Sequence, residues 1–220
     1  MIKIAIFDLD GTLVDSLTDL ALCVNKGLKK AGLEEKPVVN YKHYVGNGRD
    51  NLIRRAMGEH CNNEELFNIV MDTFNNEYAI HCNDNTSSYD GCDTMLKNLS
   101  NKGIQTAVLS NKPDEFVGDI LKKIYPQHTF VEAWGQKPEY KCKPDGEALL
   151  AILEKHKIDK SECVYIGDSD VDVFTAKNAG VKMLGVEWGF RGREELMQAG
   201  ASDVAKTADE LFKLICDCDE

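Results

Sequence analysis

Short apolar runs alternate with longer amphipathic segments through the second half of the chain. Runs of about five residues, rich in β-branched and aromatic side chains, predict strands at residues 105–110, 130–134, 163–167 and 182–186. A similar run at 4–7 opens the chain. Apolar positions at helical spacing predict helices at 93–102, 114–124, 145–156, 171–179, 193–198 and 208–215. This alternation predicts a parallel sheet, because each strand is followed by room for a crossover helix.

A purely helical pattern separates the first strand from this alternating half. Between residues 16 and 84 apolar side chains such as Leu20 and Val24 recur at helical spacing, and no run in the segment predicts a strand. We therefore expect an α/β fold with a Rossmann-like, three-layer core made of residues 1–15 and 85–220. The segment 16–84 is expected to form a small, all-helical domain inserted as a cap over the core.

The composition limits the function classes that this chain can belong to. Its 220 residues carry a formal net charge of -11, and no block of lysine and arginine is present that could follow a phosphate backbone. We therefore expect neither a nucleic-acid nor a membrane partner, and no apolar run approaches the length of a membrane span. A small phosphorylated substrate would have to be held by local positive groups. The sequence does not define the oligomeric state.

The cysteines and the start of the chain bear on its cellular compartment. The 8 cysteines are scattered, and the chain enters its first strand without an export signal. We therefore expect a cytoplasmic protein in which these residues are thiols rather than disulfides.

Two carboxylates follow directly after the first strand. Asp8 and Asp10 stand one residue apart, and in a strand residues i and i+2 point to the same side. They should therefore meet at the carboxyl edge of the sheet, where open α/β sheets bind ligands. Two carboxylates so close repel each other, and a divalent cation would relieve that repulsion. Alternatively, one of them could hold a proton, as a nucleophile paired with a general acid requires.

Polar residues also stand at the ends of later predicted strands. Ser110 and Asn111 offer a hydroxyl and backbone N–H groups that suit a phosphate. Lys143 lies just before a predicted helix, where an ammonium could neutralise phosphate charge. Asp168 and Asp172 follow the strand at 163–167 and supply the oxygen ligands that Mg²⁺ prefers.

These four segments together resemble the motifs of the haloacid dehalogenase superfamily of phosphohydrolases. The matching residues, in chain order, are Asp8-x-Asp10-Gly11-Thr12, Ser110, Lys143 and Gly167-Asp168-x-x-x-Asp172. The helical insertion is similar to the small helical cap of the first class in this superfamily. Within it, the sequence Val-Gly-Asn-Gly-Arg at 45–49 resembles the cap loop of the phosphoglycolate phosphatase branch.

The resemblance implies a phosphatase that works through an aspartyl phosphate. Asp8 would be the nucleophile, Asp10 the general acid and base, and Lys143 a third catalytic residue. Mg²⁺ would be held by Asp8, the backbone carbonyl of Asp10, Asp168 and Asp172. The phosphate and substrate would be bound by Ser110, Lys143, Asn111, the N–H groups of the loop that contains Gly11 and Thr12, and, in the cap, Arg49. The substrate would be a small phosphorylated metabolite, with phosphoglycolate as the best single expectation.

Other functions share much of this pattern. A pyrophosphatase or a sugar-phosphate mutase of the same superfamily would use the same core, whereas a dehalogenase is disfavoured because that branch lacks the second aspartate, supplied here by Asp10. From a different class, the chain could be a phosphoacceptor or a non-catalytic phosphate-binding protein. The intact motif residues favour an enzyme.

Overall fold

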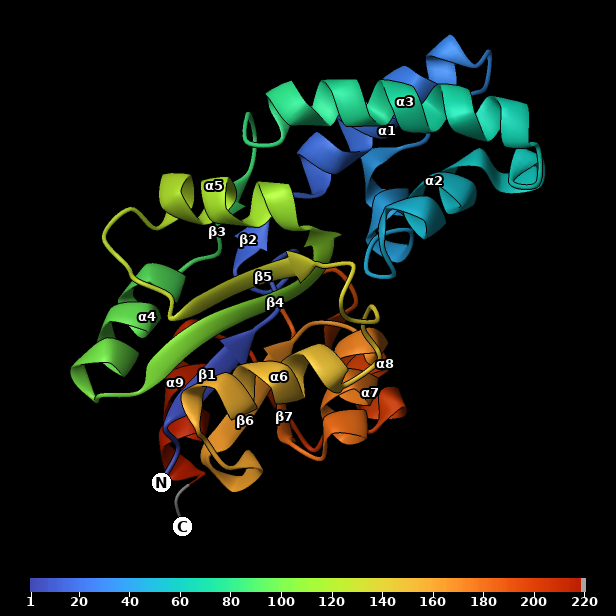
Figure 1. Cartoon of the computed structure of the whole chain (residues 1–220). Helices are drawn as coiled ribbons and strands as arrows, with labels where there is room; N and C mark the ends of the chain where they lie inside the picture. Colours follow the sequence, from blue (N-terminus) through green and yellow to red (C-terminus); the bar gives the residue numbers. More distant parts are fainter. Residues whose placement is uncertain (219–220) are drawn as a thin grey trace.

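A six-stranded parallel sheet forms the centre of the computed structural model, which describes residues 1–218 (Figure 1). The strands lie in the order β5-β4-β1-β6-β7-β8. Their bounds are β1 Ile4–Phe7, β4 Gln105–Pro113, β5 Glu132–Gln136, β6 Cys163–Gly167, β7 Lys182–Val186 and β8 Asp203–Ala205. All five neighbouring pairs are parallel, which confirms the predicted fold class.

Helices cover both faces of the sheet and complete three layers. One face packs against α4 Cys92–Asn101, α5 Asp114–Ile124 and α9 Ala208–Asp217, and the other against α6 Glu147–His156, α7 Asp170–Ala179 and α8 Gly192–Ala199 (Figure 1). A short 3₁₀ helix, η3 Lys160–Glu162, precedes β6. In β1, Ala5 and Phe7 belong to the hydrophobic core on the face covered by α4, α5 and α9. Ile4 and Ile6 belong to the core on the opposite face, as the alternation of side chains along a strand requires. The two hydrophobic cores therefore fix both faces of the strand that leads to Asp8.

The inserted segment is helical, as predicted. Its elements are α1 Leu17–Lys30, η1 Val38–His43, α2 Arg49–Met57, η2 Gly58–His60 and α3 Glu64–His81. They enclose a third hydrophobic cluster, and in Figure 1 they lie as a group to one side of the sheet. The chain enters this group through β2 Val14–Asp15 and leaves it through β3 Ser87–Ser88, which pair antiparallel. The two connections to the cap are thus fastened to each other.

Most expected elements are found, with shifts at their ends. The strands β6 and β7 and the helix α5 have the predicted bounds, whereas β5 was expected at 130–134 and lies two residues later. It lies later because Phe130 packs edge-on against His128, while β4 continues to Pro113 and pairs there with Gln136. The helix expected at 145–156 begins at 147, because the carboxylate of Asp145 accepts the N–H of Glu147 and precedes the first turn.

Candidate active site

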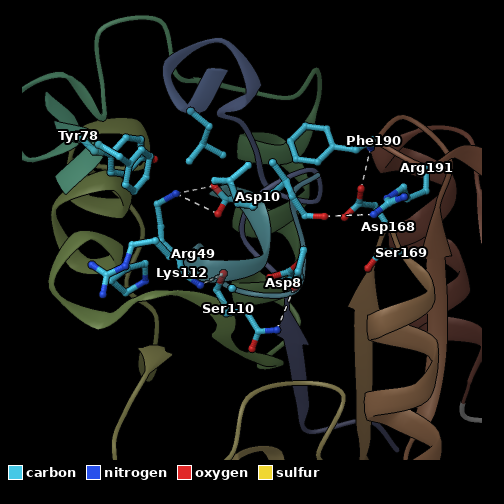
Figure 2. Close-up of a pocket in the computed structure, with 18 residues that line it drawn as sticks. Asp8, Asp10, Arg49, Tyr78, Ser110, Lys112, Asp168, Ser169, Phe190 and Arg191 are labelled. Carbon is cyan, nitrogen blue, oxygen red and sulfur yellow. Dashed lines mark hydrogen bonds and ion pairs between the residues drawn. The ribbon is translucent and has the colours of Figure 1, made fainter. Parts of the chain in front are cut away.

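The candidate functional residues lie where the order in which strands are added to the sheet changes direction. From β1 the chain moves outward through β4 and β5, then returns to place β6 on the other side of β1. Open α/β sheets bind ligands at the carboxyl ends of the strands at such a point. Asp8 follows β1, Ser110 lies near the end of β4, and Asp168 follows β6, so that three separate segments meet in one pocket (Figure 2).

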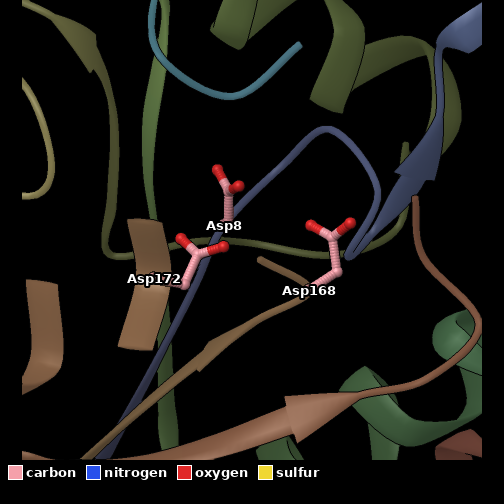
Figure 3. A group of neighbouring side chains, drawn as sticks. All are labelled: Asp8, Asp168 and Asp172. Carbon is pink, nitrogen blue, oxygen red and sulfur yellow. The ribbon is translucent and has the colours of Figure 1, made fainter. Parts of the chain in front are cut away.

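Three buried carboxylates form a cluster at this edge of the sheet. One oxygen from each of Asp8, Asp168 and Asp172 lies within 4.8 Å of the others (Figure 3). Two glycines allow this approach. A Cβ atom on Gly11, which has φ +88°, would lie 2.4 Å from Oδ2 of Asp168, and one on Gly167 would lie 2.2 Å from Cγ of Asp172.

Lys143 is the cation of this cluster. Its Nζ lies 2.9 Å from Oδ1 of Asp8 and 2.8 Å from Oδ1 of Asp172, and it donates to the hydroxyl of Tyr165 at 3.0 Å. Burial alone would lower the pKa of Lys143, but the charges of Asp172 and Asp8 outweigh it and raise that pKa well above its ordinary value. Burial is also the main reason why the pKa of Asp8 rises to about 7, against the opposing effect of Lys143.

Asp10 has a different cation as its partner. Nζ of Lys112 lies 2.9 Å from Oδ1 and 3.0 Å from Oδ2 of Asp10, and the hydroxyl of Ser16 donates to Oδ1 at 2.5 Å. Both members of the ion pair are almost completely buried. The two aspartates of the first motif therefore occupy distinct electrostatic environments, one beside Lys143 and the other beside Lys112.

The cap closes over these groups and supplies part of the pocket wall. The amide of Asn111 donates to the carbonyl of Gly46 in the cap at 2.9 Å, and the guanidinium of Arg191 donates to the carbonyl of Val45 at 3.2 Å. The pocket is lined by side chains from both parts: Asp8, Asp10, Ser110, Asn111, Lys112, Pro113, Asp168, Ser169, Phe190 and Arg191 from the core, and Leu20, Val45, Gly46, Gly48, Arg49, Leu52, Phe74 and Tyr78 from the cap.

The structure brings most of the predicted site residues to this pocket. Asp8, Asp10, Ser110, Asn111, Arg49 and Asp168 line it, while Lys143 and Asp172 lie against Asp8. Gly11 and Thr12 are outside its wall. Their N–H groups hydrogen-bond within the turn, to the carbonyls of Val14 and Leu9, and the hydroxyl of Thr12 donates to Asp168 at 3.3 Å. Their expected phosphate contacts stay predictions.

The amide of Asn111 and the carboxylate of Asp10 also have partners that the sequence did not indicate. The Asn111 side chain joins Gly46 to both the N–H and the carbonyl of Lys143, which leaves only its backbone for the expected phosphate contact. The carboxylate of Asp10 is not a member of the acidic cluster. This is compatible with metal binding through its backbone carbonyl, which also stays a prediction.

Among the pocket residues that were not predicted from the sequence are Lys112, Tyr78 and Arg191. Lys112 could have been found, because it stands two positions after Ser110 in a strand and so points to the same side. Tyr78 fits the apolar face of a helix and gives no separate signal. Arg191 lies between β7 and α8, in a segment held at the site by the hydrogen bond from the N–H of Phe190 to Asp168, a contact that the sequence does not reveal.

The acidic cluster suits a divalent cation. The cluster holds three carboxylates and one ammonium group, which contacts only Asp8 and Asp172, and burying this excess of negative charge is unfavourable without further positive charge. Carboxylate oxygens are the preferred ligands of Mg²⁺. Burial first, and then the charges of Asp172 and Asp8, raise the pKa of Asp168, as expected for a group that lacks a cation partner of its own. The donor set therefore fits the ion.

Comparison with known proteins places the chain in a family. The model of the haloacid dehalogenase-like hydrolases matches residues 5–186. A phosphoglycolate phosphatase of Vibrio parahaemolyticus is 32% identical over 97% of this chain and 96% of its own length. Another from Pseudomonas putida is 31% identical over 98% of this chain and 79% of its own length.

Solved structures that are similar to this chain are also described as phosphatases. A predicted phosphoglycolate phosphatase from Haemophilus somnus is 28% identical, with a TM-score of 0.89 over 97% of each chain. A Clostridium acetobutylicum protein described as a predicted phosphatase is 26% identical, with a TM-score of 0.87 over 99% of each chain. Within residues 1–218, no helix combines the length and the apolar character needed to cross a membrane. The chain belongs to the haloacid dehalogenase-like hydrolases and, within them, is similar to phosphatases.

Proposed function

We propose that this protein is a Mg²⁺-dependent phosphatase that hydrolyses a phosphomonoester of a small metabolite, with phosphoglycolate as the first candidate. The observation that carries the proposal is the position of Asp8. Its carboxylate lies at the pocket wall, paired with Lys143 at 2.9 Å and beside Asp168 and Asp172. The relatives that are 32% identical over almost the whole chain are phosphoglycolate phosphatases, which supports the choice of substrate.

The chemistry would proceed in two steps. In the first, an oxygen of Asp8 bonds to phosphorus while the bond between phosphorus and the alcohol oxygen breaks, and Asp10 gives its proton to that oxygen. In the second, water attacks the aspartyl phosphate, Asp10 takes a proton from it, and the bond to Asp8 breaks to release phosphate. Ser110 and Lys143 would hold the phosphoryl oxygens through both steps.

The cation would be held by Asp8, Asp168 and Asp172, with the backbone carbonyl of Asp10 as a further ligand. When bound, Mg²⁺ would supply positive charge that keeps these carboxylates ionised and offsets the charge of the phosphoryl group. Lys143 lies on the same groups, so it would orient Asp8 and Asp172 and share in neutralising the phosphate.

The closed cap argues for a small substrate. Cap and core touch at the pocket through two neighbouring cap residues, Gly46 with Asn111 and Val45 with Arg191. A bulky alcohol group would have to displace these contacts, whereas a group of a few atoms would not.

The decisive experiment removes the nucleophile. Phosphate release from p-nitrophenyl phosphate and from phosphoglycolate should require added Mg²⁺. It should fall at least about 1000-fold in Asp8→Asn, because an amide cannot form the acyl phosphate. Asp119→Asn makes the same chemical change on the exposed surface of α5 and should keep full activity. Undiminished turnover by Asp8→Asn would refute the mechanism.

A further inference from the structure

Two polar atoms in the wall of the pocket have no partner. Among residues 1–218, only three buried side-chain nitrogen or oxygen atoms make no hydrogen bond, and two of them are Oη of Tyr78 and Nε of Arg49. Both residues line the pocket. Leaving a buried polar group unsatisfied costs about 1–3 kcal/mol, so such atoms are normally satisfied in some functional state. Their presence in one wall points to a ligand.

Lys112 adds a positive charge to the same wall. Its Nζ lies 4.9 Å from the centre of the Tyr78 ring. An ammonium has three N–H groups, and the two hydrogen bonds to the carboxylate of Asp10 leave one of them, beside the hydroxyl of Tyr78, for another acceptor. The ring of Tyr78 is held in place by Phe74, stacked at 5.1 Å, and by Phe116 of the core, edge-on at 5.2 Å. Lys112 and Tyr78 are therefore preorganised before any ligand arrives.

These donors lie on the Asp10 side of the pocket rather than beside Asp168. Figure 2 shows Tyr78, Arg49 and Lys112 on one side of the pocket and Asp168 and Ser169 on the other, with Asp8 between them. Lys112 contacts Asp10, the residue proposed to protonate the departing alcohol. An acceptor on the alcohol fragment would consequently lie beside Lys112, with Tyr78 and Arg49 in the same wall.

We propose that Lys112 and Tyr78, together with Nε of Arg49, bind a carboxylate on the alcohol part of the substrate and so select phosphorylated hydroxy acids. This inference rests on the proposed phosphatase function. The charge of the wall fits an anionic group, because Lys112 and Arg49 both supply positive charge. The neighbouring side chains Leu20, Leu52 and Phe74 are apolar and would not solvate a second phosphate.

The test compares two esters of nearly equal size and shape. Phosphoglycolate carries the carboxylate, whereas 2-amino-2-oxoethyl phosphate carries a neutral amide in its place. We expect Lys112→Met to lower the ratio of the two kcat/KM values about 10- to 100-fold, and Tyr78→Phe to lower it by a smaller factor. Any effect of Lys112 on Asp10 acts on both esters equally and cancels in this ratio. Lys112→Arg should retain most of the preference, and Lys122→Met, on the exposed surface of α5, all of it.

The stability of Tyr78→Phe supplies a second readout. Because no hydrogen bond of ordinary length and angle holds the hydroxyl, its removal should leave Tm nearly unchanged. A clear drop in Tm would mean that the hydroxyl has a structural role instead.

An equal loss on both esters in Lys112→Met, or no preference of the native enzyme for the acid, would overturn the inference while leaving the phosphatase function intact. If no phosphate ester is hydrolysed, the proposed function fails. The carboxylate site can then be tested by calorimetry, which measures the affinity of Asp8→Asn for each ester with and without the second substitution Lys112→Met. A loss of affinity confined to phosphoglycolate would support the carboxylate site, and equal affinities for the two esters would refute it.

Discussion

At the scale of single residues, the site depends on how closely backbone and carboxylate can approach each other. Gly11 has φ +88°, and a Cβ atom there would lie only 2.4 Å from Oδ2 of Asp168. The same carboxylate accepts the N–H of Phe190 at 2.7 Å and therefore cannot retreat without breaking that bond. The turn after β1 thus requires glycine both for its backbone conformation and for the room that it gives to Asp168.

Gly11→Ala should therefore cost both stability and activity. The left-handed backbone alone costs a non-glycine residue about 1–2 kcal/mol. At Gly11 the clash with Asp168 comes in addition, so the free energy of unfolding in urea should fall by more than that, and phosphatase activity should be largely lost. Gly32→Ala is the matched control, because Gly32 has φ +72° but no heavy atom within 4 Å of its added Cβ. It should lose only the backbone contribution; an equal loss at the two positions would show that the clash is relieved.

Several of the residues that were predicted from the sequence share one property: they stand at or near the end of an apolar strand. Asp8 and Asp168 are visible for this reason, since a buried strand leads directly to a charged group. Lys112 was not recognised, although it stands two positions after Ser110 in a strand, the same spacing that separates Asp8 from Asp10. Tyr78 could not be recognised, because its function would depend on an unsatisfied hydroxyl that only the folded packing reveals.

At the scale of elements, periodicity predicted the long segments and missed the short ones. The strand β8 has three residues, and β2 and β3 have two each, too few for an alternation to be detected. These short strands are defined by their partners instead, β8 by its pairing with β7 and the linker strands by each other. The boundaries of the cap at 16 and 84, which lie beside the linker strands, stay a prediction.

The junction between α1 and the segment after α3 depends on one buried carboxylate. Asp19 accepts hydrogen bonds from the backbone and side chains of Asn85 and Thr86, at 2.7 to 3.0 Å. Asp19→Asn places an amide N–H₂ against these donors, and the free energy of unfolding should fall by about 2–3 kcal/mol in urea denaturation. Asp72→Asn, on the exposed face of α3, should change it by less than about 0.5 kcal/mol. Similar losses in the two variants would contradict this function for Asp19.

At the scale of the whole molecule, the overall charge and the charge of the site have opposite effects on a substrate. The chain carries a formal net charge of -11, which repels a phosphorylated acid at a distance. Lys112, Arg49 and Arg191 in the pocket wall and Lys143 beside Asp8 offset this effect locally. A divalent cation at the acidic cluster would add to them, and its binding should be measurable as a change in the stability of the whole protein.

Mg²⁺ should stabilise the folded protein, and more so at pH 8 than at pH 5.5. Burial raises the pKa of Asp8 from 3.8 to about 7, so its contribution to stability is full below pH 3.8 and is lost as the pH rises through 7. Mg²⁺ binds the ionised carboxylates. At a pH where they are ionised, its binding therefore compensates for the stability that is lost when Asp8 ionises. At 100 times its dissociation constant it should raise Tm by roughly 5–10 °C at pH 8. Asp168→Asn should abolish most of this increase and Asp119→Asn none of it, because only Asp168 belongs to the acidic cluster; an equal increase in both would place the bound ion elsewhere.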